Sequence, residues 1–157
     1  MELDLIAPDA LDGQQHAALI ALLTSAFPAD PPELLEVELA RASDPRLGLG
    51  LCAVEGEQVL GAILARLPSA RSAFVIYLAT AEPDRRQGIA RALLDRLSVS
   101  AGTQFALFVT DDNVAAERLY RAGGLAPDGG PAPAQQRRWS GTWQPRTVAT
   151  SDTAGVS

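Results

Sequence analysis

The hydrophobic residues of this chain recur with two different periods, and each change of period marks a boundary between predicted elements. Apolar side chains three or four residues apart predict helices, whereas short runs rich in β-branched and aromatic residues predict strands. Proline and glycine clusters separate these segments. The pattern predicts helices over 14–27, 33–42, 87–99 and 115–122, and strands over 2–7, 49–54, 58–67, 73–80, 104–109 and 136–143.

The predicted order, β-α-α-β-β-β-α-β-α-β, is typical of an α/β fold with a mixed sheet and helices on both faces. Segment 73–80, AFVIYLAT, is the densest in β-branched and aromatic residues, so we expect it to be a central strand covered on both sides. Segment 126–135, APDGGPAPAQ, is expected to be irregular. In the last strand Trp139 and Trp143 share one face, and they pack either on the sheet or in a dimer contact.

Length and composition narrow the classes of protein that remain. A chain of 157 residues predicts a single domain over 1–143, followed by a small, polar and disordered tail over 144–157. The net charge of −6 argues against a nucleic-acid partner. The lone Cys52 excludes an internal disulfide and a cysteine-based zinc site, and we expect no metal. We see no secretory signal and no membrane-spanning apolar run, so the expected location is the cytoplasm without membrane contact.

One stretch, LATAEPDRRQGIARALLDRL from Leu78 to Leu97, joins a strand end, a turn and an amphipathic helix. Its turn has the spacing Arg-x-x-Gly-x-Ala at Arg85, Gly88 and Ala90. Glycine lets the backbone approach a ligand, and the free N–H groups of a helix N-terminus favour an anion. The pattern predicts a pyrophosphate cradle. It is not a Walker loop, because the chain has no lysine, nor a Rossmann fingerprint, because the first two glycines are missing.

A second motif follows a predicted strand and comprises Asn113, Ala116, Leu119, Tyr120, Gly124 and Leu125. The two motifs together resemble the GCN5-related N-acetyltransferases (GNAT), whose second motif has phenylalanine where this chain has Leu125. The resemblance covers residues 1–143. It implies a mixed, mostly antiparallel sheet in which the parallel strands 73–80 and 104–109 splay apart to admit acetyl-CoA as cosubstrate. The nearest subfamily resemblance is to aminoglycoside 3-N-acetyltransferases.

The resemblance also implies roles for individual residues. The backbone of strand 73–80 pairs with the pantetheine arm, the helix start holds the pyrophosphate, and Asn113 touches the pantetheine or caps its helix. Tyr120 is the expected catalytic residue, because its hydroxyl can protonate the leaving thiolate. The expected cofactor-binding residues are Leu78, Ala79, Thr80, Arg85, Arg86, Gln87, Gly88, Ile89, Ala90, Arg91 and Asn113.

The base that receives the proton of the amine is not evident in the sequence. Many members of the family carry a carboxylate on the central strand, where this chain has Tyr77, and no acid lies between Arg71 and Glu82. We expect Tyr77 to be a core residue. The open alternatives are a water-mediated path or a remote acid, namely Glu33, Glu36, Glu38, Glu82, Asp111 or Asp112.

The sequence therefore predicts an N-acetyltransferase that transfers an acetyl group from acetyl-CoA to a primary amine of a small molecule in a ternary complex. A cationic acceptor, similar to an aminoglycoside or a polyamine, is compatible with the net charge. Two alternatives stay open. The missing strand carboxylate favours a non-catalytic acyl-CoA-binding or regulatory module, and a protein or peptide can replace the small acceptor. A homodimer is a further alternative to a monomer.

Overall fold

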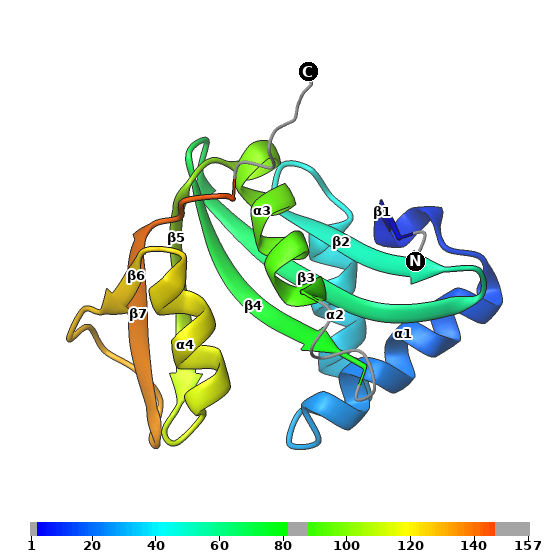
Figure 1. The fold of residues 1–157 in the computed structure, drawn as a ribbon. Coiled ribbons are helices and arrows are strands. Elements are labelled where there is room, and N and C mark those ends of the chain that lie inside the picture. Colours follow the sequence, from blue (N-terminus) through cyan, green and yellow to red (C-terminus); the bar gives the residue numbers. More distant parts are fainter. Residues whose placement is uncertain (1–2, 82–87, 147–157) are drawn as a thin grey trace.

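The computed structural model describes residues 3–81 and 88–146, which fold around one seven-stranded sheet (Figure 1). The strand order is β1-β2-β3-β4-β5-β7-β6, so β4 is the central strand. All neighbours are antiparallel except the parallel pair β4–β5, which confirms the predicted fold class. The elements are β1 (Asp4–Ile6), the 3-10 turn η1 (Pro8–Ala10), α1 (Gly13–Ala26), α2 (Pro32–Ala42), β2 (Gly48–Glu55), β3 (Gln58–Ser69), β4 (Ser72–Thr80), α3 (Ile89–Ala101), β5 (Gln104–Thr110), α4 (Val114–Ala122), β6 (Leu125–Pro127) and β7 (Gln136–Thr142).

Helices cover both faces of the sheet, and each face has its own apolar cluster. Leu19 of α1 and Leu39 of α2 pack with Ala62 on one face. Leu93 of α3 packs with Tyr120 of α4 on the other. No helix among the described residues has the length and apolarity needed to cross a lipid bilayer.

Local sequence signals account for several element boundaries. A reciprocal capping box starts α1, because Asp12 Oδ1 accepts from the Gln15 amide at 2.7 Å and Gln15 Oε1 accepts from the Asp12 amide at 3.0 Å. Pro32 occupies the first position of α2, where its missing N–H costs nothing. The expectation of an irregular segment over 126–135 is wrong at its start, because β6 pairs with β7 there. This pairing is tertiary, and the three-residue sequence of β6, Leu-Ala-Pro, is too short to reveal it.

The central strand contains an irregularity that changes which way its side chains point. Val75 lies opposite Ala65 and Tyr77 lies opposite Leu64, so Ile76 is the extra residue of a β-bulge. In a regular strand Val75 and Tyr77 would share one face. Here Val75 packs in the cluster under α3 and α4, whereas Tyr77 packs in the cluster under α1 and α2. The bulge therefore aims Tyr77 at the loop between α1 and α2.

Strands β4 and β5 pair over only part of their length. Their register runs from Ser72 opposite Gln104 to Val75 opposite Leu107 and then ends. Beyond this point β4 continues to Thr80 and β5 to Thr110, and Figure 1 shows the two strands diverging. The edge of β4 that faces β5 is thus left without a strand partner after Val75, as expected for a splayed pair.

Both tryptophans belong to the core of the molecule. Trp139 and Trp143 are each 1% exposed and lie in the cluster under α3 and α4, so packing within the chain, not a dimer contact, explains them. Trp143 Nε1 donates to Asp95 Oδ1 at 2.9 Å, and its ring stacks on Phe105 with centroids 5.6 Å apart. Arg91 Nη2 donates to the Gln144 carbonyl at 2.9 Å, so the described start of the expected tail lies against α3. Residues 147–157 lie outside the described part.

Candidate active site

Three neighbouring cavities surround the point where β4 and β5 diverge. The first, of about 300 Å³, opens between β4, α3 and α4 and is called here the α3–α4 cavity. The second, of about 110 Å³, lies in the gap itself and is called the splay cavity. The third, of about 640 Å³, lies over β4 and β5 on the side of the α1–α2 loop and is called the outer cavity.

The splay cavity links the other two. It shares Leu78, Asn113, Ala116 and Tyr120 with the α3–α4 cavity. It shares Phe27, Val75, Ile76, Phe108 and Thr110 with the outer cavity. Two molecules that enter from opposite faces of the sheet can therefore meet beside Tyr120.

Most of the predicted cofactor-binding residues come together in the α3–α4 cavity. Its lining includes Leu78, Ala79, Thr80, Gly88, Ala90, Arg91 and Asn113, together with Tyr120. Ile89 is an exception, because its side chain is 1% exposed and packs in the core. Arg85, Arg86 and Gln87 lie outside the described residues.

The start of α3 explains the glycine of the first motif. Gly88 is the N-cap of α3 and has φ +74° and ψ 17°, a left-handed conformation that glycine adopts without strain. A Cβ there would meet nothing closer than Arg146 Nη2 at 3.9 Å. The requirement for glycine is therefore conformational, and it places the free amides of the helix N-terminus at the α3–α4 cavity.

Replacing Gly88 with alanine should strain this left-handed turn by about 1 kcal/mol. We expect a small loss in the free energy of unfolding, measured by urea denaturation, together with weaker acetyl-CoA binding, measured by calorimetry. Gly56 offers a matched control, because its φ is +60° with open space around it and it lies in the β2–β3 turn, away from the three cavities. Equal loss of acetyl-CoA binding in Gly56→Ala would contradict a local role for Gly88.

The guanidinium group of Arg91 is engaged in contacts within the protein. Its Nε lies 3.3 Å from Asp95 Oδ1, and its guanidinium lies 4.8 Å from the centroid of the Trp143 ring. Only 14% of the side chain is exposed. The guanidinium is thus held against the protein, which leaves the backbone amide of Arg91 as its group for a ligand.

Tyr120 lies where the α3–α4 and splay cavities meet. Asn113 begins its helix, because Asn113 Oδ1 accepts from the Ala116 amide at 3.1 Å. Within the described residues the Tyr120 hydroxyl makes no hydrogen bond to the protein, so it is available to a ligand. Burial raises the pKa of Tyr120 to about 12, so the hydroxyl carries its proton at neutral pH.

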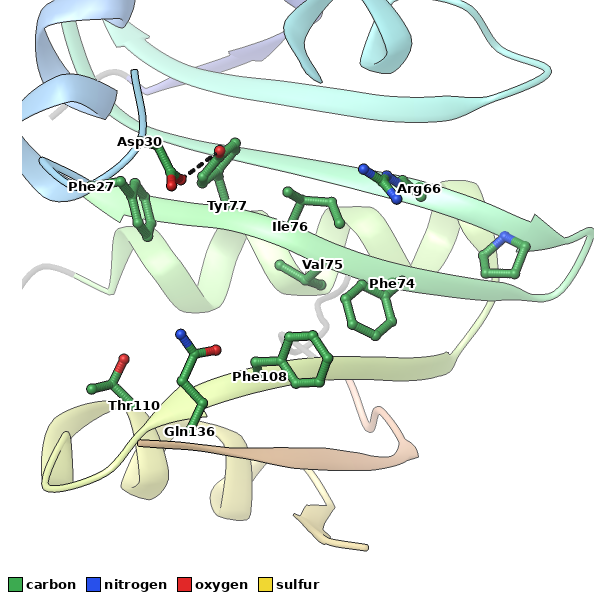
Figure 2. Close-up of a pocket in the computed structure, with 11 residues that line it drawn as sticks. Phe27, Asp30, Arg66, Phe74, Val75, Ile76, Tyr77, Phe108, Thr110 and Gln136 are labelled. Carbon is green, nitrogen blue, oxygen red and sulfur yellow. Dashed lines mark hydrogen bonds between the residues drawn. The ribbon is translucent and has the colours of Figure 1, made fainter. Parts of the chain in front are cut away.

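The outer cavity contains an acid that the sequence pattern did not single out. Tyr77 Oη donates to Asp30 Oδ2 at 2.7 Å, and the Tyr77 ring lies 4.7 Å from that of Phe27 (Figure 2). Burial and the Asp30 carboxylate both raise the pKa of Tyr77, so this hydroxyl is a donor and not a base. The expectation that Tyr77 belongs to the core is incomplete, because the residue is 5% exposed and also lines the cavity. Asp30 lies between Pro28 and Pro31 in the α1–α2 loop, and only the bulge in β4 brings Tyr77 to it.

The acids proposed from sequence are placed elsewhere. Glu38 is buried and bound to Arg66, with Arg66 Nη2 2.5 Å from Glu38 Oε2. Glu33 and Glu36 are exposed on α2, and Asp111 lies 3.9 Å from Arg137. None of these acids, nor Asp112, lines any of the three cavities, and Glu82 is outside the described residues. In the described ranges no three metal-ligating side chains of the His, Cys, Asp or Glu type gather in one place.

A family model matches the sequence, and solved acetyltransferase structures have a similar fold. The model of the acetyltransferase (GNAT) family matches residues 16–124. The PaiA N-acetyltransferase from Thermoplasma acidophilum, solved in complex with coenzyme A, has a similar fold with TM-score 0.70 and 14% identity, covering 91% of this chain and 100% of that one. An acetyltransferase from Streptococcus agalactiae gives TM-score 0.73 and 16% identity over 89% and 98% of the two chains.

A chain of the NatC complex bound to Gag peptide and CoA gives TM-score 0.68 and 18% identity over 89% of this chain and 96% of that one. No curated protein matches the sequence. The resemblance to aminoglycoside 3-N-acetyltransferases is not confirmed by these comparisons. The family model nevertheless covers most of the chain, including the first motif and the second motif as far as Gly124. The chain therefore belongs to the acetyltransferase (GNAT) family.

Proposed function

We propose that this protein transfers the acetyl group of acetyl-CoA to a primary amine of a small molecule, by direct attack in a ternary complex. The observation that carries the proposal is the splay cavity, which lies beside Tyr120 between the α3–α4 cavity on one face of the sheet and the outer cavity on the other. Separate entries allow both substrates to be bound at the same time. The reacting groups then meet in the gap between β4 and β5.

The α3–α4 cavity suits acetyl-CoA. The unpaired edge of β4 after Val75 offers backbone groups to the amides of the pantetheine arm, as a neighbouring strand would. The N-terminus of α3 at Gly88 offers free N–H groups to the pyrophosphate. The thioester then lies near Tyr120, at the entrance to the splay cavity.

At this site the acceptor amine attacks acetyl-CoA directly. The ammonium group of the acceptor loses one proton to water, and the neutral nitrogen attacks the thioester carbonyl. The amide of Leu78 or Ala79 stabilises the oxyanion. The carbon–nitrogen bond forms, the carbon–sulfur bond breaks, and Tyr120 gives its proton to the departing thiolate. The nitrogen releases a second proton, which restores Tyr120, so the net products are an amide, CoA and one free proton.

Two measurements test the proposal. Acetyl-CoA titrated calorimetrically should bind at micromolar concentration, and thiol release should appear with at least one amine from a panel of monoamines, polyamines, aminoglycosides, amino acids and peptides. Binding without turnover by any amine would favour the non-catalytic module. Turnover confined to peptides would favour a protein N-acetyltransferase. Absence of acetyl-CoA binding would overturn the proposal itself.

A further inference from the structure

The side chains that line the outer cavity restrict which kind of amine can bind there. We infer that the acceptor is a monoamine with an aromatic or apolar body, whose single ammonium group binds Asp30; this inference rests on the proposed function. Asp30 and Tyr77 form the amine-binding end of the cavity, and Phe74 and Phe108 form the surface that receives the body. Polycations such as aminoglycosides and polyamines are disfavoured.

An apolar surface lies between β4 and β5 in the outer cavity. The rings of Phe74 and Phe108 meet edge to face, with centroids 5.1 Å apart, and both line the outer cavity (Figure 2). Phe108 is 38% exposed, although it lies on a strand in the middle of the sheet. Val75, Ile76 and Pro68 complete this part of the lining. A surface of this kind gains most from an apolar or aromatic ligand.

The carboxylate of Asp30 is placed and oriented at one end of the outer cavity. Asp30 is the only carboxylate in the described lining of the outer cavity, and Phe27 beside it also lines the splay cavity. The Asp30 amide donates to the Phe27 carbonyl at 3.1 Å, and Tyr77 Oη donates to Asp30 Oδ2. The first bond fixes the backbone of Asp30 and the second fixes its carboxylate, while Oδ1 accepts no hydrogen bond from the described residues. An ammonium group bound at Oδ1 would lie at the end of the cavity nearest the gap.

A positively charged side chain, Arg66, lines the other end of the outer cavity. Arg66 lies opposite Phe74 in the register of β3 and β4, whereas Tyr77 lies farther along, opposite Leu64. Glu38 holds Arg66 through Nε and Nη2, but Glu38 also contacts Arg41 Nη1 at 3.6 Å. The three groups together carry one net positive charge. A second ammonium group that extended along the cavity towards Arg66 would therefore approach this excess positive charge, which is unfavourable.

Steady-state turnover at saturating acetyl-CoA tests the inference with phenethylamine and tryptamine against spermidine and kanamycin. We expect kcat/KM for the aromatic monoamines to exceed that for the polycations by at least tenfold. Preference for spermidine or kanamycin would overturn the inference and leave the proposed function intact. If no amine is acetylated the proposed function fails, and calorimetric binding of phenethylamine to the CoA-saturated protein still decides the inference, because absence of binding overturns it.

Two variants locate the effect in the outer cavity. Asp30→Asn keeps the size of the side chain but removes its charge, so KM for phenethylamine should rise by about 10- to 100-fold while acetyl-CoA affinity stays unchanged. Asp44→Asn is the matched control, since Asp44 pairs with Arg46 in the α2–β2 loop away from the three cavities. Phe108→Ser tests the apolar surface without a core change and should lower kcat/KM for tryptamine selectively. An Asp30→Asn protein with the KM of the parent would contradict the assignment.

Discussion

Replacing Tyr120 with phenylalanine is expected to lower kcat by roughly 100-fold or more, the usual effect of losing a positioned general acid. The hydroxyl lies at the junction of the α3–α4 and splay cavities and makes no hydrogen bond to other described residues. Its proton is therefore free for the leaving thiolate. Phenylalanine keeps the ring, so the packing around α4 is retained. Thiol release under saturating acetyl-CoA and amine measures the effect.

Two controls separate this role from a structural one. The calorimetric Kd for acetyl-CoA and the free energy of unfolding should change little in Tyr120→Phe. Tyr77→Phe removes the other tyrosine hydroxyl, and there we expect a rise in KM for the amine with little change in kcat. Equal kcat in the Tyr120→Phe variant and the parent would show that the thiolate leaves without help from Tyr120.

The raised pKa of Tyr120 also predicts a pH effect on stability. The folded protein holds this proton up to about pH 12, whereas an unfolded tyrosine releases it near pH 10. The contribution to stability is therefore fully present below pH 10 and is lost as the pH rises towards 12. Urea denaturation of the parent and Tyr120→Phe between pH 8 and 11.5 should show a steeper alkaline loss of stability in the parent.

Replacing Trp143 with alanine is expected to lower the free energy of unfolding by about 3–5 kcal/mol, the usual cost of deleting a buried tryptophan. The indole stacks on Phe105, donates to Asp95 and lies beneath the Arg91 guanidinium. Its loss leaves a cavity under α3 and deprives Asp95 of a hydrogen bond. Because Arg91 lies at the start of α3, acetyl-CoA binding should weaken as well. Urea denaturation and calorimetry measure the two effects.

Gly123 gives this prediction an internal check. A Cβ on Gly123 would lie 2.1 Å from Trp143 Cζ3, so Gly123→Ala should itself be destabilising through this clash. The backbone of Gly123 has φ −89°, which any residue adopts, so the cost is steric. In the double variant with Trp143→Ala the clash is gone, and the combined loss should be smaller than the sum of the two single losses. Simple additivity would contradict the proposed contact.

The sequence was sufficient to predict the elements that depend on local patterns. Apolar periodicity located α1, α2, α3 and α4, and β-branched runs located the main strands. Gly88 and Asn113 were recognisable because each is tied to a local backbone requirement, a left-handed turn and a helix N-cap. The spacing of the two motifs was likewise sufficient to indicate the family. These features need only a few neighbouring residues, so they can be predicted from sequence.

Features that depend on contacts between distant segments were not predictable in this way. Strand β6 was missed because its only support is pairing with β7, and the two tryptophans could not be assigned between the core and a dimer contact. Glu38 appeared available as an acid but is bound by Arg66, which lies 28 residues away. Neither partner carries a sequence signal for the other.

The sequence by itself determined the order of helices and strands, the glycine N-cap of α3 and the position of Tyr120 on α4, because local spacing specifies each of them. Only the tertiary structure decided which side chains line the outer cavity. The bulge at Ile76 turns Tyr77 to the opposite face from Val75, and the α1–α2 loop brings Asp30 to its hydroxyl from 47 residues away. Register and loop closure are set by the packing of both faces of the sheet, which no short stretch of sequence encodes.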